Sequence, residues 1–187
     1  MGIALSGGEA SNPNTSIGIS RKMMLALGYE VPFLFAILAV MTYYETTSLV
    51  EVVKAQQNSL WGVIYLPLPA IAYFMILPAM LGIRPFDIVS APQEIASGPA
   101  VEYGGRYLAL TTIQHGFHMF IGIGLFVNLF LGGGNLLIFL VKMLVIFILS
   151  VFINAVFPRL RIDQAIKYCW KWPAILALAG LIIARIV

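Results

Sequence analysis

Five long apolar stretches constrain this chain more than any other feature of its sequence. Of its 187 residues, 60% are hydrophobic and 10% are charged. A soluble domain carries about 25% charged residues, so this chain could not coat a surface that faces water. About twenty apolar residues in a helix cross a hydrocarbon core of about 30 Å. We therefore predict an all-α, polytopic membrane protein with five transmembrane helices, at residues 23–44, 60–83, 107–131, 136–157 and 170–187.

The polar segments between these stretches predict one membrane domain, residues 1–187, with short loops. Residues 1–20 are small and polar, which indicates a loop. Prolines inside the first two stretches predict kinked helices. Residues 46–57 mix apolar and charged side chains and could form a short helix at the membrane interface. Residues 84–106 form a long loop punctuated by proline and glycine, and loops of this length usually bind or move something.

The basic residues predict how the chain is oriented. Eight of the eleven fall on one side of a five-helix threading, Lys54 and Arg185 fall on the other, and Lys142 lies within a span. Cytoplasmic loops carry the excess of lysine and arginine, so the loop 84–106 is expected to face the cytoplasm of a prokaryotic cell. The eight are Arg21, Lys22, Arg84, Arg106, Arg159, Arg161, Lys167 and Lys171.

Several classes of function find no support in the sequence. The sequence has no internal repeat of the kind that inverted-repeat transporters show. It also has no sustained basic face of the kind that binds nucleic acid. The single cysteine, Cys169, excludes an internal disulfide and a cysteine-ligated cluster within the chain. Without a nucleophile–base pair, a phosphate loop or a cofactor fingerprint, we predict no catalytic residue, no metal site and no cofactor in this chain.

Glu30 and Lys142 are ionisable residues inside predicted spans. Glu30 lies about 10 Å below the cytoplasmic end of the first span. Intramembrane charges are functional by default, and the alternative is a structural hydrogen bond to a neighbouring helix. Lys142 could snorkel to the outer surface, but Ser150 and Asn154 continue a polar trace along its helix, which favours a proton relay.

His115 and His118 are three residues apart and share a helix face. Histidine titrates near neutral pH and can pass protons, so a relay is one interpretation of this pair. The other is a pair of neutral histidines bonded to threonine or to the backbone. Two possible ligands without a third are weak evidence for a metal.

The loop acids Asp87, Glu94 and Glu102 lie between Arg84 and Arg106. Arg84 with Asp87, and Glu102 with Arg106, have the spacing of local ion pairs. Apolar residues alternate with these charges, so much of the loop should be buried against another surface. Carboxylates partly removed from water in this way suit gating and proton movement.

The loop sequence from residue 84 to residue 105, RPFDIVSAPQEIASGPAVEYGG, resembles the signature loop of the NuoH family. NuoH is the membrane subunit at the heel of respiratory complex I, and its homologues serve archaeal energy-converting membrane-bound hydrogenases. Residues 10–21, 28–31, 157–164 and 170–171 agree with the same family in the same order. The form of the loop is more similar to the hydrogenase-type members than to complex I.

The resemblance implies a membrane subunit of a multi-subunit, ion-pumping oxidoreductase that has no redox centre of its own. Its loop would pack beneath hydrophilic redox subunits that hold iron–sulfur clusters and, in a hydrogenase, a nickel–iron site. Antiporter-like subunits would adjoin it in the lipid bilayer, and protons or sodium ions would be moved. A purely structural anchor is the alternative.

The resemblance also implies roles for particular residues. It assigns Asp87, Glu94 and Glu102 to the coupling loop and Glu30 to the start of a buried polar path. The positions of His115, His118 and Lys142 deeper in the spans, argued above from the residues, extend the predicted ion path. Ser90 and Pro92 stand where family loops commonly carry further carboxylates. The family's first three helices have no counterpart in this sequence, and a partner chain is expected to supply these helices. The resemblance assigns Arg159, Arg161 and Asp163 to the cytoplasmic surface beneath the redox module. Arg21, Arg84 and Arg106, on the same basic side, complete the predicted docking set; Arg159 and Asp163 also have the spacing of a local ion pair.

Overall fold

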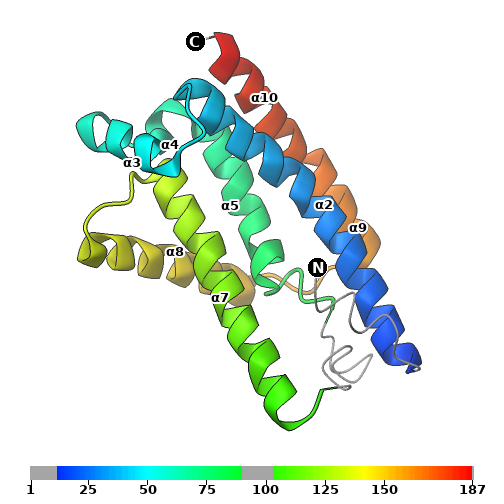
Figure 1. The fold of residues 1–187 in the computed structure, drawn as a ribbon. Helices are drawn as coiled ribbons and strands as arrows, with labels where there is room; N and C mark the ends of the chain where they lie inside the picture. The colour runs from blue at the N-terminus through cyan, green and yellow to red at the C-terminus, as the bar shows by residue number, and fades with distance from the viewer. Residues whose placement is uncertain (1–11, 90–102, 187) are drawn as a thin grey trace.

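The computed structural model describes residues 12–89 and 103–186, and all regular structure in these ranges is helical (Figure 1). The prediction of an all-α membrane protein is therefore confirmed for the described part of the chain. In chain order the helices are α2 (Pro13–Tyr43), α3 (Leu49–Asn58), α4 (Gly62–Tyr65), α5 (Pro67–Leu81), α7 (Gly105–Phe130), α8 (Leu136–Val156), α9 (Ile162–Lys171) and α10 (Pro173–Ile186).

Four stretches among the described residues are long and apolar enough to cross a membrane: α2, α7, α8 and the run of α9 and α10. The expected span at residues 60–83 is instead divided into α4 and α5. The break follows from Pro67, which has no N–H with which to continue α4 and is well suited to the first position of a new helix. The 15 residues of α5 extend about 22 Å, less than a hydrocarbon core of about 30 Å.

Two helices begin earlier than the sequence predicted. Helix α2 starts at Pro13, inside the segment 1–20 expected to be a loop, because the Asn12 side chain accepts a hydrogen bond from the Asn14 N–H at 3.1 Å. Helix α9 starts at Ile162, before the expected fifth span, and continues into α10 with only Trp172 between them. The short helix expected at residues 46–57 is present as α3.

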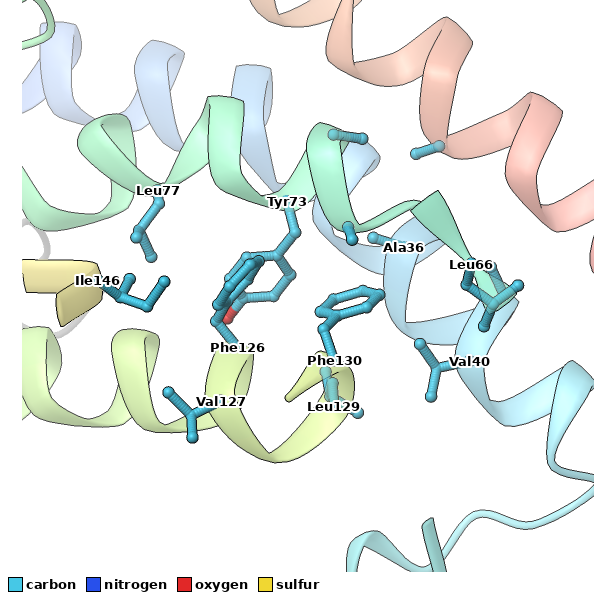
Figure 2. Close-up of a cluster of buried hydrophobic side chains, with 14 of the residues drawn as sticks. Ala36, Val40, Leu66, Tyr73, Leu77, Phe126, Val127, Leu129, Phe130 and Ile146 are labelled. Carbon is cyan, nitrogen blue, oxygen red and sulfur yellow. The ribbon is translucent and has the colours of Figure 1, made fainter. Parts of the chain in front are cut away.

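Tyr73 of α5 lies at the centre of the main core (Figure 2). Its ring contacts Phe33 of α2 and Phe126 and Phe130 of α7, with centroids 5.4 to 6.0 Å apart. Its hydroxyl donates a hydrogen bond to the Gly122 carbonyl of α7 at 3.0 Å, so the only polar atom of the side chain is satisfied. The side chain therefore joins three helices, and α10 packs on α2 and α5 behind it.

Helix α8 packs much less than the other spans and is strongly inclined to α7 (Figure 1). Most of its large apolar side chains are exposed, including Leu137, Leu144 and Phe152. Lipid is an apolar solvent, so this surface fits direct contact with acyl chains.

Candidate functional site

The first residues of the loop 84–106 are held against the membrane bundle. Helix α5 ends at Leu81 and is capped by Gly82, whose φ of 65° lies in the left-handed region that favours glycine. The Arg84–Pro85 bond that follows is cis. Phe86 is then only 2% exposed, and its ring lies 5.6 Å from that of Tyr168 in α9. The loop therefore starts as a packed segment.

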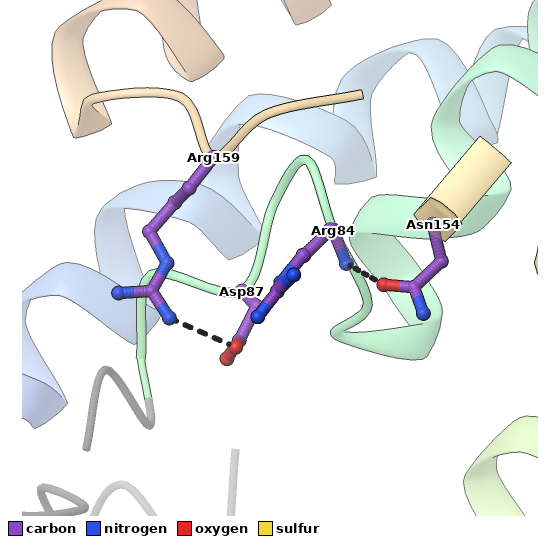
Figure 3. A network of polar contacts seen from close by, with 4 residues as sticks. All are labelled: Arg84, Asp87, Asn154 and Arg159. Carbon is purple, nitrogen blue, oxygen red and sulfur yellow. Dashed lines mark hydrogen bonds and ion pairs between the residues drawn. The ribbon is translucent and has the colours of Figure 1, made fainter. Parts of the chain in front are cut away.

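Three polar contacts tie this start of the loop to the end of α8 and to the segment that follows it, and Figure 3 shows two of them, Arg84 with Asn154 and Asp87 with Arg159. The Arg84 N–H donates to Asn154 Oδ1 at 3.0 Å, and the Leu160 N–H donates to the Pro85 carbonyl at 2.9 Å. The Arg159 guanidinium donates to Asp87 Oδ2 at 3.1 Å. Residues about 70 positions apart in sequence thus form one surface at this end of the bundle. We call it the loop platform: residues 84–89 together with residues 154–163.

The ion pair of Asp87 with Arg159 differs from the two local pairs that sequence spacing suggested. The Arg159 guanidinium reaches Asp87 on the other segment rather than Asp163 on its own. The side chains of Arg159 and Asp87 are 22% and 23% exposed, so water and a docking protein can both reach the pair. At this exposure the pair is partly buried, so water screens its attraction less than that of a pair on an open surface.

A cavity of about 430 Å³ opens beside the ion pair. Four of the six residues predicted to dock a cytoplasmic partner line it, and Ile88, Leu160 and Ile162 complete its wall. The other two docking candidates lie elsewhere: Arg84 precedes Pro85 in the loop platform, and Arg106 stacks over Tyr107 at the start of α7. The four are Arg21, Arg159, Arg161 and Asp163.

Glu30 is half-buried in α2, three residues before Phe33. Residues three apart share a helix face, and the Phe33 ring contacts Tyr73, so Glu30 lies on the side of α2 that faces α5. Because α2 begins at Pro13, ten residues before the expected span, the depth of Glu30 in a membrane stays a prediction.

His115 and His118 are exposed on the first half of α7. From Gly105 to His118 every residue of α7 except Thr111 is exposed, whereas most residues after Ile121 are buried. His115 approaches the end of α5, since a Cβ added at Gly82 would lie 3.6 Å from its Cε1 atom. The structure therefore does not bring the two histidines together with Glu30 in one buried site.

Lys142 lies at the opposite end of the bundle from the loop platform. Its ammonium donates to the carbonyls of Leu131 at 2.6 Å and Gly133 at 2.8 Å, and it lies 4.9 Å from the centre of the Trp61 ring. These carbonyls follow the end of α7, where helical backbone acceptors lack partners. The geometry is that of a side chain that caps the turn between α7 and α8.

The polar trace that linked Lys142 to Ser150 and Asn154 is not continuous. Ser150 donates to the Ile146 carbonyl of its own helix at 2.9 Å, and Asn154 lies in the loop platform, about 18 Å along α8 from Lys142. The sequence marked Asn154 as polar within an apolar helix, but its hydrogen-bond partner lies 70 residues away and has no signal in the sequence.

Gln56 is a structural residue that the sequence analysis missed. It is 1% exposed in α3, donates to the Leu129 carbonyl at 2.8 Å and accepts from the Gly62 N–H at 3.0 Å. It therefore fastens α3 and the start of α4 to the end of α7. Its amphipathic helix was visible in the sequence, but the identity of its partner was not.

The described ranges do not include every predicted site residue. Glu94 and Glu102 lie in residues 90–102, outside the described part of the chain. Among the described residues, no group of three histidine, cysteine, aspartate or glutamate side chains could hold a metal ion.

Comparisons with known proteins agree on one family. The model of the family described as NADH dehydrogenase matches residues 1–185. A subunit of the NADH-quinone oxidoreductase of Carboxydothermus hydrogenoformans is 31% identical over 189 residues, which cover 96% of this chain and 54% of the relative. A subunit of the F(420)H(2) dehydrogenase of Methanosarcina mazei is 28% identical over 187 residues, which cover 91% of this chain and 53% of the relative. This chain thus spans about half the length of the curated relatives it matches.

A solved structure supports the same assignment. A chain of the membrane-bound sulfane sulfur reductase, an archaeal respiratory membrane complex, is 43% identical with a TM-score of 0.93, covering 98% of this chain and 64% of that chain. The match over almost every residue, in both sequence and fold, shows that this chain belongs to the NADH dehydrogenase family of NuoH-type membrane subunits.

Proposed function

We propose that this chain docks a hydrophilic redox module on its loop platform and couples electron transfer in that module to translocation of protons or sodium ions. Its relatives are named as subunits of an oxidoreductase and a dehydrogenase, and the solved relative belongs to a respiratory membrane complex. The loop platform would face the cytoplasm of a prokaryotic cell, as the basic residues predict. Iron–sulfur clusters, with a nickel–iron site in a hydrogenase-type complex, would belong to the partner subunits.

The ion pair of Asp87 with Arg159 is the observation that carries this proposal. It joins the start of the loop to the segment before α9, and α9 in turn packs on α2, the helix of Glu30. A change of charge in a module above the loop platform would alter the attraction between the two side chains. Because Pro85 and Phe86 hold the loop start in place, such a change would be passed to the helices rather than lost in a free loop.

The role of the pair can be tested with Asp87→Asn in the intact membrane complex. The amide keeps the shape of the side chain and loses its charge. We expect the ion gradient formed per electron transferred to fall several-fold in inverted membrane vesicles, while electron transfer to a soluble acceptor stays within about twofold of wild type.

Glu51→Gln is the control, because it also neutralises one carboxylate, but at an exposed residue of α3 outside the loop platform. It should leave the ratio of ions to electrons unchanged. If Asp87→Asn reduced only the amount of assembled complex and the ratio stayed at the wild-type value, the chain would be a structural anchor and the coupling role would be rejected.

A further inference from the structure

The backbone at the start of the loop 84–106 depends on a side chain from another span. The N–H groups of Gly82 and Ile83 donate back into α5, at 3.3 and 3.1 Å. The next N–H, that of Arg84, donates instead to Asn154 Oδ1 of α8 at 3.0 Å (Figure 3). Pro85 has no N–H to donate. The Asn154 amide is therefore the acceptor that sets where the chain leaves α5.

Asn154 continues the stripe by which α8 packs on the bundle. The buried residues of α8 are Met143, Ile146 and Ser150, and Asn154 follows Ser150 by four positions, so all four share one helix face. The Ser150 hydroxyl donates to the Ile146 carbonyl of its own helix at 2.9 Å. Among the described residues of this stripe, Asn154 is thus the one whose side chain bonds to another segment.

The other sides of α8 face outwards. Of the four candidate spans, α8 buries the smallest share of its residues. Contacts with acyl chains have no preferred direction, so the tilt of a span is set by its packing on other helices and by anchors at its ends. Segments with few buried contacts also shift at a low cost in free energy. The inclination of α8 therefore depends on one narrow stripe and on its polar end contacts.

A second link from the start of the loop leads to a helix that is held more firmly. The Leu160 N–H donates to the Pro85 carbonyl at 2.9 Å, just before α9 begins. Helix α9 buries Ala165 and Cys169, and Cys169 lies close to Gly28 of α2. A displacement at the start of the loop would therefore be resisted by α9 and followed by α8.

We propose that Asn154 is the positioning residue that makes α8 follow the start of the loop. The proposal rests on the proposed coupling function and names the span by which a change at the loop platform enters the membrane part. Asp87 lies three residues after Arg84, so a change in its pair with Arg159 displaces the peptide whose N–H is bound to Asn154. Helix α8 then tilts with that peptide.

The first experiment removes this hydrogen bond in the intact membrane complex. Asn154→Leu keeps a side chain of similar size and shape but removes the acceptor. We expect the number of ions moved per electron, measured in inverted membrane vesicles, to fall several-fold. Asn154→Asp keeps an acceptor oxygen in either protonation state and should restore a ratio within about twofold of wild type.

Ser150→Ala is the matched control. It removes a buried polar group from the same stripe, but the Ser150 hydroxyl bonds only to the carbonyl of Ile146 in its own helix. The ratio of ions to electrons in this variant should therefore stay at the wild-type value.

Three results of this experiment would overturn the proposal. A wild-type ratio in Asn154→Leu, even with less assembled complex, would show that the hydrogen bond only holds the fold. Equal losses in Asn154→Leu and Ser150→Ala would show a general effect of looser packing along α8. A ratio in Asn154→Asp as low as that in Asn154→Leu would show that the acceptor oxygen is not what matters.

A second experiment follows α8 in the wild-type complex and so does not depend on the stability of a variant. Amide hydrogen exchange is measured by mass spectrometry before and after reduction of the complex with dithionite. We expect residues 84–89 and the last turns of α8, residues 149–156, to change their protection together. A change at residues 84–89 without one in α8, or no change in either segment, would contradict the proposal.

The two variants Asn154→Leu and Asp87→Asn separate this proposal from the proposed function. If Asn154→Leu had no effect while Asp87→Asn still lowered the ratio, the coupling function would stand and the displacement would enter the membrane by another route. If neither variant changed the ratio, both proposals would fail.

Discussion

Replacing Gly180 by alanine should destabilise the bundle by at least about 2 kcal/mol, although alanine is the better helix former. A Cβ at this position of α10 would overlap Cγ and Cδ of the Pro69 ring and lie 3.1 Å from the Pro69 nitrogen in α5. A proline ring in the first turn of a helix has no rotamer by which to move away. The two helices would have to separate, and α10 would lose its contact with α5 and α2.

Gly28→Ala is the control for this prediction. Gly28 is also a buried helix glycine at a helix contact, but a Cβ there would lie 3.8 Å from Cys169 Cβ and from Ile166 Cα, which is ordinary van der Waals contact. It should be neutral or slightly stabilising. The measurement is the melting temperature of the purified complex, where about 2 kcal/mol corresponds to roughly 4–8 °C. Equal melting temperatures for the two variants would show that α10 and α5 are not packed as described.

Replacing Lys142 by methionine should lower the free energy of unfolding by about 3 kcal/mol. Methionine removes two hydrogen bonds from a charged donor, and it also removes the contact with the Trp61 ring. Methionine keeps most of the apolar stem, but the carbonyls of Leu131 and Gly133 would lose their shared donor. We expect the melting temperature to fall by roughly 6–12 °C. Lys54→Met, at an exposed lysine of α3, should leave it unchanged.

Lys142→Arg separates a capping role from a proton relay. Arginine keeps the charge and can donate to both carbonyls, but it does not release its proton in proteins. A cap therefore predicts near-normal stability and an unchanged number of ions moved per electron. Loss of ion movement in a stable Lys142→Arg complex would contradict the capping role and restore the relay that the polar trace of α8 suggested.

Much of the fold could be predicted from local sequence, because helices that cross a membrane satisfy their own backbone groups and need only a long apolar stretch. Two of the five predicted spans, α7 and α8, have counterparts that begin and end within a few residues of the expected bounds. Helix α2 and the pair α9–α10 end near the expected residues but begin ten and eight residues earlier. The residue that causes the break before α5, Pro67, is also visible in the sequence. A proline can either kink a helix or end it, and packing decides between the two outcomes.

The contacts of the candidate site could not be predicted in the same way. The spacing of Asp87 and Arg84 suggested a local pair, yet Asp87 pairs with Arg159, because the packing of Phe86 on α9 brings the two segments together. A shared helix suggested that Lys142 acts with other polar residues of α8, but its partners are backbone carbonyls, which have no signature in a sequence. A partner far along the chain is chosen by tertiary packing, which periodicity does not encode.

The shortness of α5 has a consequence for the backbone that precedes it. Where the other spans cross a core of about 30 Å, α5 extends only about 22 Å, and the backbone before Pro67 leaves the helix. Polar backbone at this depth is tolerated where it is buried in protein or meets water. The backbone that precedes α5 must therefore find its hydrogen-bond partners within the protein, as the Gly62 N–H does in the Gln56 side chain at 3.0 Å. Gln56 is itself bound to the Leu129 carbonyl, so the end of α7 supports the segment that completes this crossing.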